Sequence, residues 1–187
     1  MTRTKFSRSE FSFYDHYAEP NPTIEGWMTP LELDWLYQNA KRKFLILEVG
    51  SWKGRSTHAL LSSGSRVIVV DTFEGTPNEL ETAHREAKYV DIFSSFILNV
   101  GRFRKLSVLR MNSVSASNLF EDKTFDMIFL DGSHEYTFFK DDVENWLPKC
   151  ISLFCGHDLH EGDTFRVLED LKIYYTKGPG SIWYCTL

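Results

Sequence analysis

Acidic and polar residues follow short apolar runs at several points of this 187-residue chain. Carboxylates in such positions can accept hydrogen bonds from hydroxyl groups, hold a divalent cation or move a proton. Each apolar run reads as a strand, so these residues would mark strand ends that could face a ligand. The residues concerned are Glu48, Asp71, Asn112, Ser113, Asp131 and Asp158.

The first of these strand ends continues into a loop bracketed by two glycines, Gly50 and Gly54, with Ser51 between them. Glycine allows backbone amides to approach a ligand closely and tolerates positive φ. Asp71 follows 21 residues after Gly50, and an acid at the end of a second strand can accept both hydroxyls of a ribose. The spacing therefore predicts a ligand that contains a nucleoside. An ordinary strand-to-helix turn is the alternative interpretation of the glycines alone.

The glycine loop does not match a dinucleotide site. Such a site needs the pattern GxGxxG, so that a pyrophosphate can lie on the helix N-terminus, whereas bulky Trp52 and Lys53 fill the loop here. Tyr136 and Lys140 form a YxxxK pair typical of short-chain dehydrogenases. We interpret this pair as a chance match, because Tyr136 belongs to the apolar stripe of its own predicted helix.

Apolar periodicity predicts alternating strands and helices after an initial helix. That helix begins with a capping box formed by Thr29, Pro30 and Glu32. Five βα units followed by a hairpin favour a doubly wound, Rossmann-like α/β sheet, mostly parallel with a C-terminal antiparallel hairpin. Ligands bind such sheets at the carboxyl ends of the strands. The expected strands span 44–49, 67–70, 106–111, 125–130, 151–155, 173–175 and 181–187, and the expected later helices span 56–62, 78–100 (begun by Asn78, with a break, and stopped by Gly101), 136–146 and 164–171.

Length and composition fit one domain over residues 24–187, preceded by an arm over residues 1–23. The arm is rich in aromatic residues, and we expect a partly ordered tail, a lid over a substrate or an arm onto a second subunit. A net charge of −5 and a sequence pI of about 5.7 disfavour nucleic acid as a partner. No apolar run reaches the ~20 residues of a membrane span, and the first residues lack a secretory apolar core. Three cysteines without CxxC spacing favour a reduced, cytoplasmic protein.

Five sequence blocks lie at or near the predicted strand ends. They are EVGSWKGRST (48–57), VDTFEGTP (70–77), FDMIFLDGSHEY (125–136), DVENWLPK (142–149) and GHD (156–158). Together the blocks resemble class I S-adenosylmethionine-dependent methyltransferases, and in particular their macrocin O-methyltransferase-like and cephalosporin hydroxylase-like branch. The resemblance covers roughly residues 24 to 187, with the blocks in the right order.

The resemblance implies roles for the strand-end residues. Asp71 would bind the ribose of S-adenosylmethionine, and Asn112 and Ser113 match the place where such enzymes contact adenine. The methionine part of the cofactor would be held by Glu48 and by the backbone of the glycine loop. The implied cofactor-binding residues are Glu48, Gly50, Ser51, Gly54, Asp71, Asn112, Ser113 and Asp131.

The resemblance also implies a divalent-metal site of Asp131, Asp158 and His157, with His134 as the general base. An alkyl hydroxyl is too weak an acid to ionise alone at neutral pH. A Mg²⁺ ion held by carboxylates would polarise it, and a neutral imidazole could take its proton. The alternatives are that Asp131 is only a turn residue, that His134 only neighbours a helix cap, and that His157 bonds only backbone.

The expected function is Mg²⁺-assisted O-methylation of a hydroxyl on a sugar-like or other small metabolite. Two departures from the family pattern oppose this: Lys149-Cys150-Ile151 replaces a Gly-Gly turn, and Met111-Asn112-Ser113 replaces the commoner Gly-Asp-Ser. The short chain leaves the acceptor to the aromatic arm, to a second copy in a homo-oligomer, or to a small open site. A non-catalytic cofactor-binding module and a nicotinamide-dependent oxidoreductase are the alternative functions.

Overall fold

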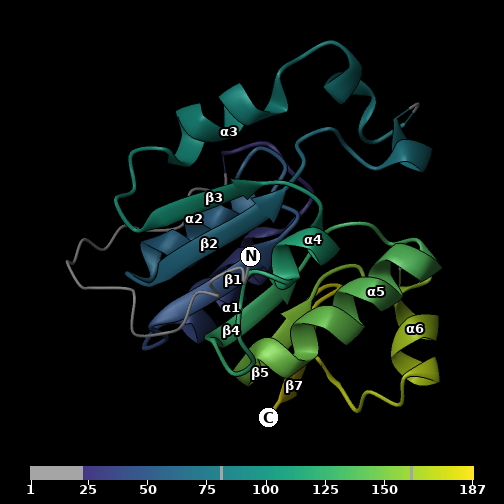
Figure 1. Ribbon diagram of the computed structural model, residues 1–187. Coiled ribbons are helices and arrows are strands. Elements are labelled where there is room, and N and C mark those ends of the chain that lie inside the picture. The colour runs from purple at the N-terminus through teal and green to yellow at the C-terminus, as the bar shows by residue number, and fades with distance from the viewer. Residues whose placement is uncertain (1–22, 81, 161) are drawn as a thin grey trace, which may run out of the picture.

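The computed structural model describes residues 23–80, 82–160 and 162–187. The predicted arm therefore lies outside the described residues, apart from its last residue. The remainder forms one seven-stranded sheet with helices on both sides (Figure 1). None of the helices in the described part of the chain is long and apolar enough to cross a membrane.

The sheet has the strand order β3-β2-β1-β4-β5-β7-β6. The first five strands are parallel neighbours, while β7 pairs antiparallel with both β5 and β6. The order reverses between β1 and β4, which is the switch point where this class of sheet binds ligands. The strands are β1 (Leu45–Val49), β2 (Arg66–Asp71), β3 (Leu106–Arg110), β4 (Phe125–Leu130), β5 (Cys150–Gly156), β6 (Thr176–Lys177) and β7 (Trp183–Thr186).

Two layers of helices cover the sheet (Figure 1). The core on one face joins the sheet to α1, α2 and α3, and the core on the other face joins it to α4, α5 and α6. The predicted doubly wound architecture is confirmed. The helices are α1 (Pro30–Ala40), α2 (Arg55–Ser62), α3 (Ile92–Val100), α4 (Ser113–Ser117), α5 (Tyr136–Trp146) and α6 (Thr164–Asp170), with 3-10 turns η2 (Pro77–Glu79), η3 (Arg85–Lys88) and η4 (Leu147–Lys149).

Strand β1 illustrates why the central strands read as continuous apolar runs. All five of its residues are buried. Leu45 and Leu47 contribute to the core on one face, whereas Ile46 contributes to the core on the other. A strand covered on both faces needs apolar side chains at successive positions, and Glu48 is the exception within this strand.

Helix α1 begins as the sequence predicts. Thr29 accepts a hydrogen bond from the backbone of Glu32, and the Glu32 carboxylate accepts one from the Thr29 backbone N–H at 2.7 Å. Pro30 occupies the first helical turn, where its missing N–H costs no hydrogen bond. The capping box is a local interaction, which is why the sequence alone reveals it.

The expected helix over residues 78–100 is largely wrong. Only its last part is helical, as α3, and Asp91 rather than Asn78 begins that helix by accepting a hydrogen bond from the Ser94 backbone. Before α3 the chain forms η2, η3 and turns, which we call the β2–α3 segment (residues 72–91). Gly101 ends the helix as predicted. The Asp91 side chain bonds the backbone and starts a new helix inside the apolar repeat, so the repeat alone did not predict where the helix begins.

Two further boundaries differ from expectation. The short helix α4, begun by Asn112, lies in a stretch for which no helix was predicted. The antiparallel pairing at the C-terminus is confirmed, but over Thr176–Lys177 and Trp183–Thr186. Residues 173–175 are not a strand, because Ile173 packs against the core and its N–H bonds the Leu168 carbonyl at the end of α6.

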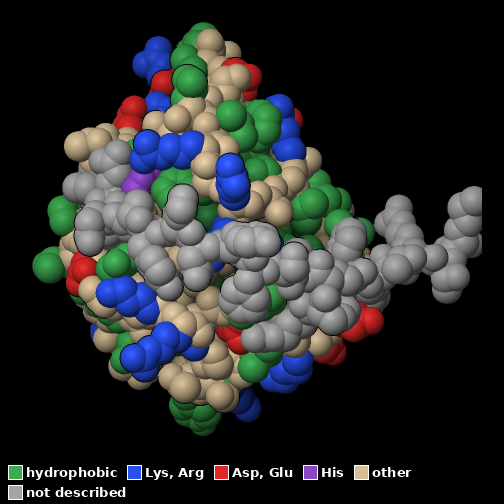
Figure 2. Space-filling model, turned by 90° about the vertical axis from the view of Figure 1, so that its left-hand side faces the viewer, with side chains coloured by type: hydrophobic (Ala, Val, Ile, Leu, Met, Phe, Trp, Pro, Cys, Tyr) green, Lys and Arg blue, Asp and Glu red, His purple; other side chains and the backbone are tan. Residues whose placement is uncertain are grey.

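The face of the molecule in Figure 2 carries basic side chains in separate small groups, with apolar, acidic and other side chains between them. Binding to a nucleic-acid backbone requires a clustered positive field. Among the described residues visible in this view, the basic side chains do not form one continuous stripe.

Candidate functional site

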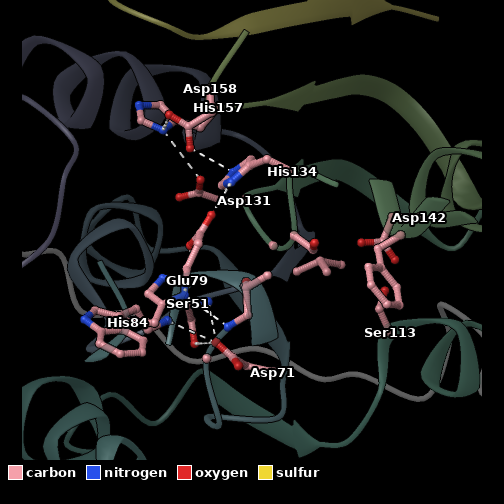
Figure 3. A pocket seen from close by; sticks show the side chains of 18 of the residues that line it. Ser51, Asp71, Glu79, His84, Ser113, Asp131, His134, Asp142, His157 and Asp158 are labelled. Atoms are coloured by element: carbon pink, nitrogen blue, oxygen red, sulfur yellow. Dashed lines mark hydrogen bonds and ion pairs between the residues drawn. The ribbon is translucent and has the colours of Figure 1, made fainter. Parts of the chain in front are cut away.

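A cavity of about 930 Å³ opens at the carboxyl edge of the sheet, where β1, β2 and β4 end. This volume lies within the range of small-molecule sites. Figure 3 shows side chains from the ends of β2, β4 and β5 converging on it, with Glu79 and His84 reaching in from the β2–α3 segment. The strand-end residues that line it are Asp71, Asn112, Ser113, Asp131 and Asp158.

The glycine loop lies against the end of β4. Gly50 has φ +78°, and a Cβ placed there would lie 2.1 Å from the Asp131 carbonyl oxygen. A side chain at this position would therefore collide with the backbone of the neighbouring strand end. Gly54 also has positive φ, at +90°, immediately before α2. Both glycines are thus required by backbone geometry and close approach.

Asp71 fastens the glycine loop from the end of β2 (Figure 3). Its Oδ2 accepts hydrogen bonds from the backbone N–H groups of Ser51 at 2.7 Å and Trp52 at 3.0 Å. Its Oδ1 accepts one from the Phe73 N–H at 2.7 Å. Oδ1 has this single acceptor contact among the described residues, so it keeps a lone pair for a hydroxyl donor.

Glu48 is fully buried beneath the glycine loop. Its Oε2 accepts a hydrogen bond from the Thr57 hydroxyl at 2.5 Å, whereas its Oε1 has no hydrogen-bond partner among the described residues. Burial, aided by the charges of Asp131 and Asp71, raises the pKa of Glu48 to about 8. An unpartnered buried acceptor costs free energy, and a cationic group bound beside it would supply the missing partner.

Ser113 lies at the other end of the cavity, opposite Asp142 (Figure 3). Its hydroxyl oxygen accepts a hydrogen bond from Trp146 Nε1 at 2.7 Å and its proton bonds the Asp142 carboxylate. Asp142 is buried, and desolvation raises its pKa to about 6 despite the Ser113 hydrogen bond. Asn112 caps α4, accepting from the Ser115 backbone at 3.1 Å. The Ser113 and Asn112 side chains therefore have local partners, which leaves backbone groups for a ligand.

Three side chains converge where β4 and β5 end: Asp131, His134 and Asp158 each place one ligand atom within 4.8 Å of the others. His134 Nε2 lies 2.8 Å from Asp158 Oδ2. Asp158 has φ +54°, a sparsely populated conformation for a non-glycine residue that is held by the surrounding structure. The arrangement offers carboxylate oxygens for a hard cation and an imidazole beside them.

The pKa of His134 bears on its predicted role as a base. Burial lowers its pKa, but the contact with Asp158 and the charges of Asp131 and Glu79 outweigh burial and raise it to about 9. A base must be neutral to accept a proton. A divalent cation on the two aspartates would neutralise the charges that favour imidazolium.

His157 does not belong to that group of three. Its Nδ1 lies 3.0 Å from Asp158 Oδ1 and 3.5 Å from Asp131 Oδ1, and its Nε2 lies 3.0 Å from Glu32 Oε1. Burial lowers its pKa, but the hydrogen bonds and charges of the two aspartates raise it to about 11. The protonated ring thus faces the aspartates as a donor, and the metal-ligand role that the resemblance implies for it stays a prediction.

His84 and Glu79 are among the lining residues that sequence reasoning missed. His84 stacks on Trp52 with ring centroids 4.6 Å apart, and its Nδ1 lies 3.0 Å from Glu79 Oε2. Glu79 Oε1 lies 3.7 Å from His134 Nδ1, so this side chain crosses the cavity (Figure 3). Both belong to the β2–α3 segment, whose turns the apolar period concealed.

The YxxxK pair points away from this chemistry. Tyr136 donates a hydrogen bond to Asp170 on α6 at 2.9 Å, and Lys140 pairs with Glu144 one turn along α5. Neither residue is part of the cavity lining. These contacts agree with a chance match.

A parallel sheet with this strand order, a glycine loop after β1 and acids at the following strand ends define a nucleoside-binding class of α/β protein. A family model described as a methyltransferase domain matches residues 47–152, which is more than half of the chain. The chain belongs to this methyltransferase family. No curated protein sequence matches it.

Solved structures share the fold at low identity. An O-methyltransferase from Bacillus cereus, in complex with S-adenosylhomocysteine, has a TM-score of 0.57 at 17% identity over 89% of this chain and 84% of its own. A TDP-rhamnose 3′-O-methyltransferase of calicheamicin biosynthesis has 0.53 at 16%, over 83% and 77%. A precorrin 8W decarboxylase from Methanobacterium thermoautotrophicum has 0.59 at 14%, over 91% and 97%. Because proteins named for different reactions share this sheet, the likeness establishes the fold only.

Proposed function

We propose that the protein is an S-adenosylmethionine-dependent O-methyltransferase that acts, with Mg²⁺, on a hydroxyl of a sugar-like or other small molecule. One observation carries this proposal: Asp131, His134 and Asp158 converge at the cavity, next to the glycine loop and Asp71. Membership of the methyltransferase family supports the cofactor, as does the S-adenosylhomocysteine bound to the Bacillus cereus structure.

The residues fit the cofactor. The buried and unpartnered Oε1 of Glu48 suits the cationic amino group of the methionine part. The free lone pair of Asp71 Oδ1 suits a ribose hydroxyl. The close packing of Gly50 against the Asp131 backbone holds the glycine loop beside the end of β4, where both line the cavity.

The residues also fit a hard divalent cation. Asp131 and Asp158 present carboxylate oxygens, the ligands that Mg²⁺ prefers, and Mg²⁺ keeps several waters when few protein groups bind it. When bound, S-adenosylmethionine supplies an electrophilic methyl group and Mg²⁺ lowers the pKa of a nearby hydroxyl. With oxygen ligands preferred, His134 remains available as the group that accepts the proton from the acceptor.

The cavity walls would orient the acceptor and the cofactor relative to one another. Methyl transfer is an in-line displacement, so the gain comes from holding the acceptor oxygen and the methyl donor in one geometry. The β2–α3 segment covers one side of the cavity and brings Trp52 and His84 together as a stacked pair. Trp27 packs against both rings, and the three side chains give this side of the cavity an aromatic wall for a sugar-like acceptor.

Calorimetric titration of S-adenosylhomocysteine into the Mg²⁺-loaded protein tests the cofactor. We expect micromolar binding, about −8 kcal/mol. An acceptor screen with and without EDTA then tests turnover, with Asp131→Ala as the inactive variant and Asp34→Ala, on the exposed face of α1, as its control. Binding without turnover of any acceptor would favour a non-catalytic module. Turnover that survives in Asp131→Ala would exclude the metal mechanism.

A further inference from the structure

The two carboxylate oxygens of Glu32 have different hydrogen-bond partners. Its Oε2 serves the cap of α1, accepting from the Thr29 backbone at 2.7 Å and the Thr29 hydroxyl at 2.8 Å. Its Oε1 takes no part in the cap. It accepts from the Ser181 backbone N–H at 2.9 Å and lies 3.0 Å from His157 Nε2. A helix cap needs only one oxygen, so the cap does not explain the second set of contacts.

The contact with His157 joins parts of the chain that are far apart in sequence. Residues 32 and 157 are separated by 125 positions. Both side chains are almost wholly buried, at 4% and 6% exposure. A buried charged group is costly unless it is paired, so this pair must be made whenever the fold is complete. The Ser181 hydroxyl closes the cluster at 2.9 Å from His157 Nε2.

The backbone leaves space for this cluster and holds it still. A Cβ at Gly180, which has φ +61°, would lie 2.1 Å from Glu32 Oε1. The backbone of His157 is fixed separately, since its N–H bonds the Leu130 carbonyl at 3.1 Å and its carbonyl accepts from Trp183 Nε1 at 3.2 Å. With the backbone fixed, the ring orientation is set by what its two nitrogens contact.

The opposite nitrogen of the same ring faces the proposed metal site. Nδ1 lies 3.0 Å from Asp158 Oδ1 and 3.5 Å from Asp131 Oδ1. Figure 3 shows these contacts from the ring to both aspartates. A ring held by Glu32 on one side therefore fixes the positions of both carboxylates on the other. Such outer contacts orient the groups that bind a metal.

We propose that Glu32 is a positioning residue of the site, which acts through His157 to hold Asp131 and Asp158 in the geometry that binds a divalent cation. This rests on the proposed function insofar as that function places a cation on the two aspartates. Glu32 touches neither the cation nor the reacting atoms.

The test compares Mn²⁺ affinity in the full chain and in Glu32→Gln, measured by the electron paramagnetic resonance signal of free Mn²⁺. Glutamine at this position keeps the capping box, so the helix start survives. Losing the charged partner of His157 should weaken Mn²⁺ binding about 10- to 100-fold. S-adenosylhomocysteine binding, measured without metal, should change little, because Glu48 and Asp71 are untouched.

Two further variants separate positioning from stability. Thr29→Ala removes the cap of α1 but leaves Glu32 Oε1 on His157, so it should destabilise the fold without changing Mn²⁺ affinity. Ser181→Ala removes the hydroxyl that contacts His157 and should weaken Mn²⁺ binding by a smaller factor. Ser181→Ala also carries the test if Glu32→Gln does not fold. A ¹⁵N spectrum of the His157 ring should change in Glu32→Gln and stay unchanged in Thr29→Ala.

The outcomes distinguish this inference from the proposed function. Equal Mn²⁺ affinity in the wild type and Glu32→Gln would overturn the positioning role while leaving the metal site intact. A matching loss of affinity in Thr29→Ala would also overturn it, since stability alone would then be responsible. Failure of the wild type to bind Mn²⁺ would remove the metal from the proposed function and the positioning role with it, whereas S-adenosylhomocysteine binding would still report on the cofactor.

Discussion

Asp142 should make the stability of this protein depend on pH in a way that one substitution removes. The side chain is 6% exposed, and burial raises its pKa from 3.8 to about 6. Each tenfold change in proton affinity corresponds to about 1.4 kcal/mol. The difference between the folded and unfolded chain is therefore about 3 kcal/mol for this group.

The sign follows from which state binds the proton. The folded protein holds a proton on Asp142 up to about pH 6, whereas the unfolded chain releases it near pH 3.8. The free energy of unfolding contributed by this group is therefore greatest below pH 4, falls as pH rises to about 6, and is constant above. Asp142→Asn has no proton to lose, so its stability relative to the wild type should rise across the same window.

Urea unfolding of Asp142→Asn and the wild type at pH values from 4 to 8 measures this directly. The difference should be small near pH 4 and reach about 3 kcal/mol in favour of the variant by pH 7. Any difference in stability between asparagine and protonated aspartate is constant. Such a difference shifts the free energy of unfolding equally at every pH and leaves its pH dependence unchanged. Asp141→Asn, which changes the exposed neighbour on α5, is the matched control and should show a much smaller rise, because the charge of Asp141 adds only a minor part to the raised pKa of Asp142.

A stability difference that does not vary with pH would refute the reasoning. So would a rise of the same size in Asp141→Asn, because the pH dependence would then reflect the net charge of α5.

Two other substitutions test the geometry of the site. Gly50→Ala places a Cβ 2.1 Å from the Asp131 carbonyl oxygen at φ +78°. It should lower the free energy of unfolding by about 1–3 kcal/mol or more and abolish S-adenosylhomocysteine binding. The control Gly132→Ala, whose Cβ would meet its nearest atom at 3.5 Å, should be nearly as stable as the wild type in thermal unfolding. Full stability of Gly50→Ala would contradict this. Trp146→Phe removes the 2.7 Å hydrogen bond to Ser113 and fully buried volume, and should cost about 2–4 kcal/mol in urea unfolding. Trp27→Phe, at a side chain 56% exposed, should cost less than 1 kcal/mol, and equal losses in the two variants would refute the account.

The sequence by itself determined the features that depend on neighbouring residues. The capping box of α1 involves positions three apart, and the buried strands reveal themselves as apolar runs because both faces of the sheet are covered. The strand-end acids Asp71, Asp131 and Asp158 could be located because parallel strands bring their carboxyl ends to one edge.

Local signals also set the limits of that prediction. Apolar residues recur at helical spacing over residues 78–100, but the first part of this stretch forms turns. The helix starts only after Asp91, whose side chain caps it. His84 and Glu79 enter the cavity from that same segment, so the error over its structure hid them. Nothing in the sequence marked Asp142 as a buried carboxylate, whereas the structure leaves it only 6% exposed.

Only the tertiary structure decided which side chains share partners. Glu32 and His157 carry no common signal in sequence, since one lies in the first turn of a helix and the other follows the last residue of a strand. Their contact exists because the helix layer over one face of the sheet brings α1 beside the end of β5. Burial of the charges then requires them to pair. The contacts of His157 with Glu32 on one side and the two aspartates on the other are therefore a product of folding.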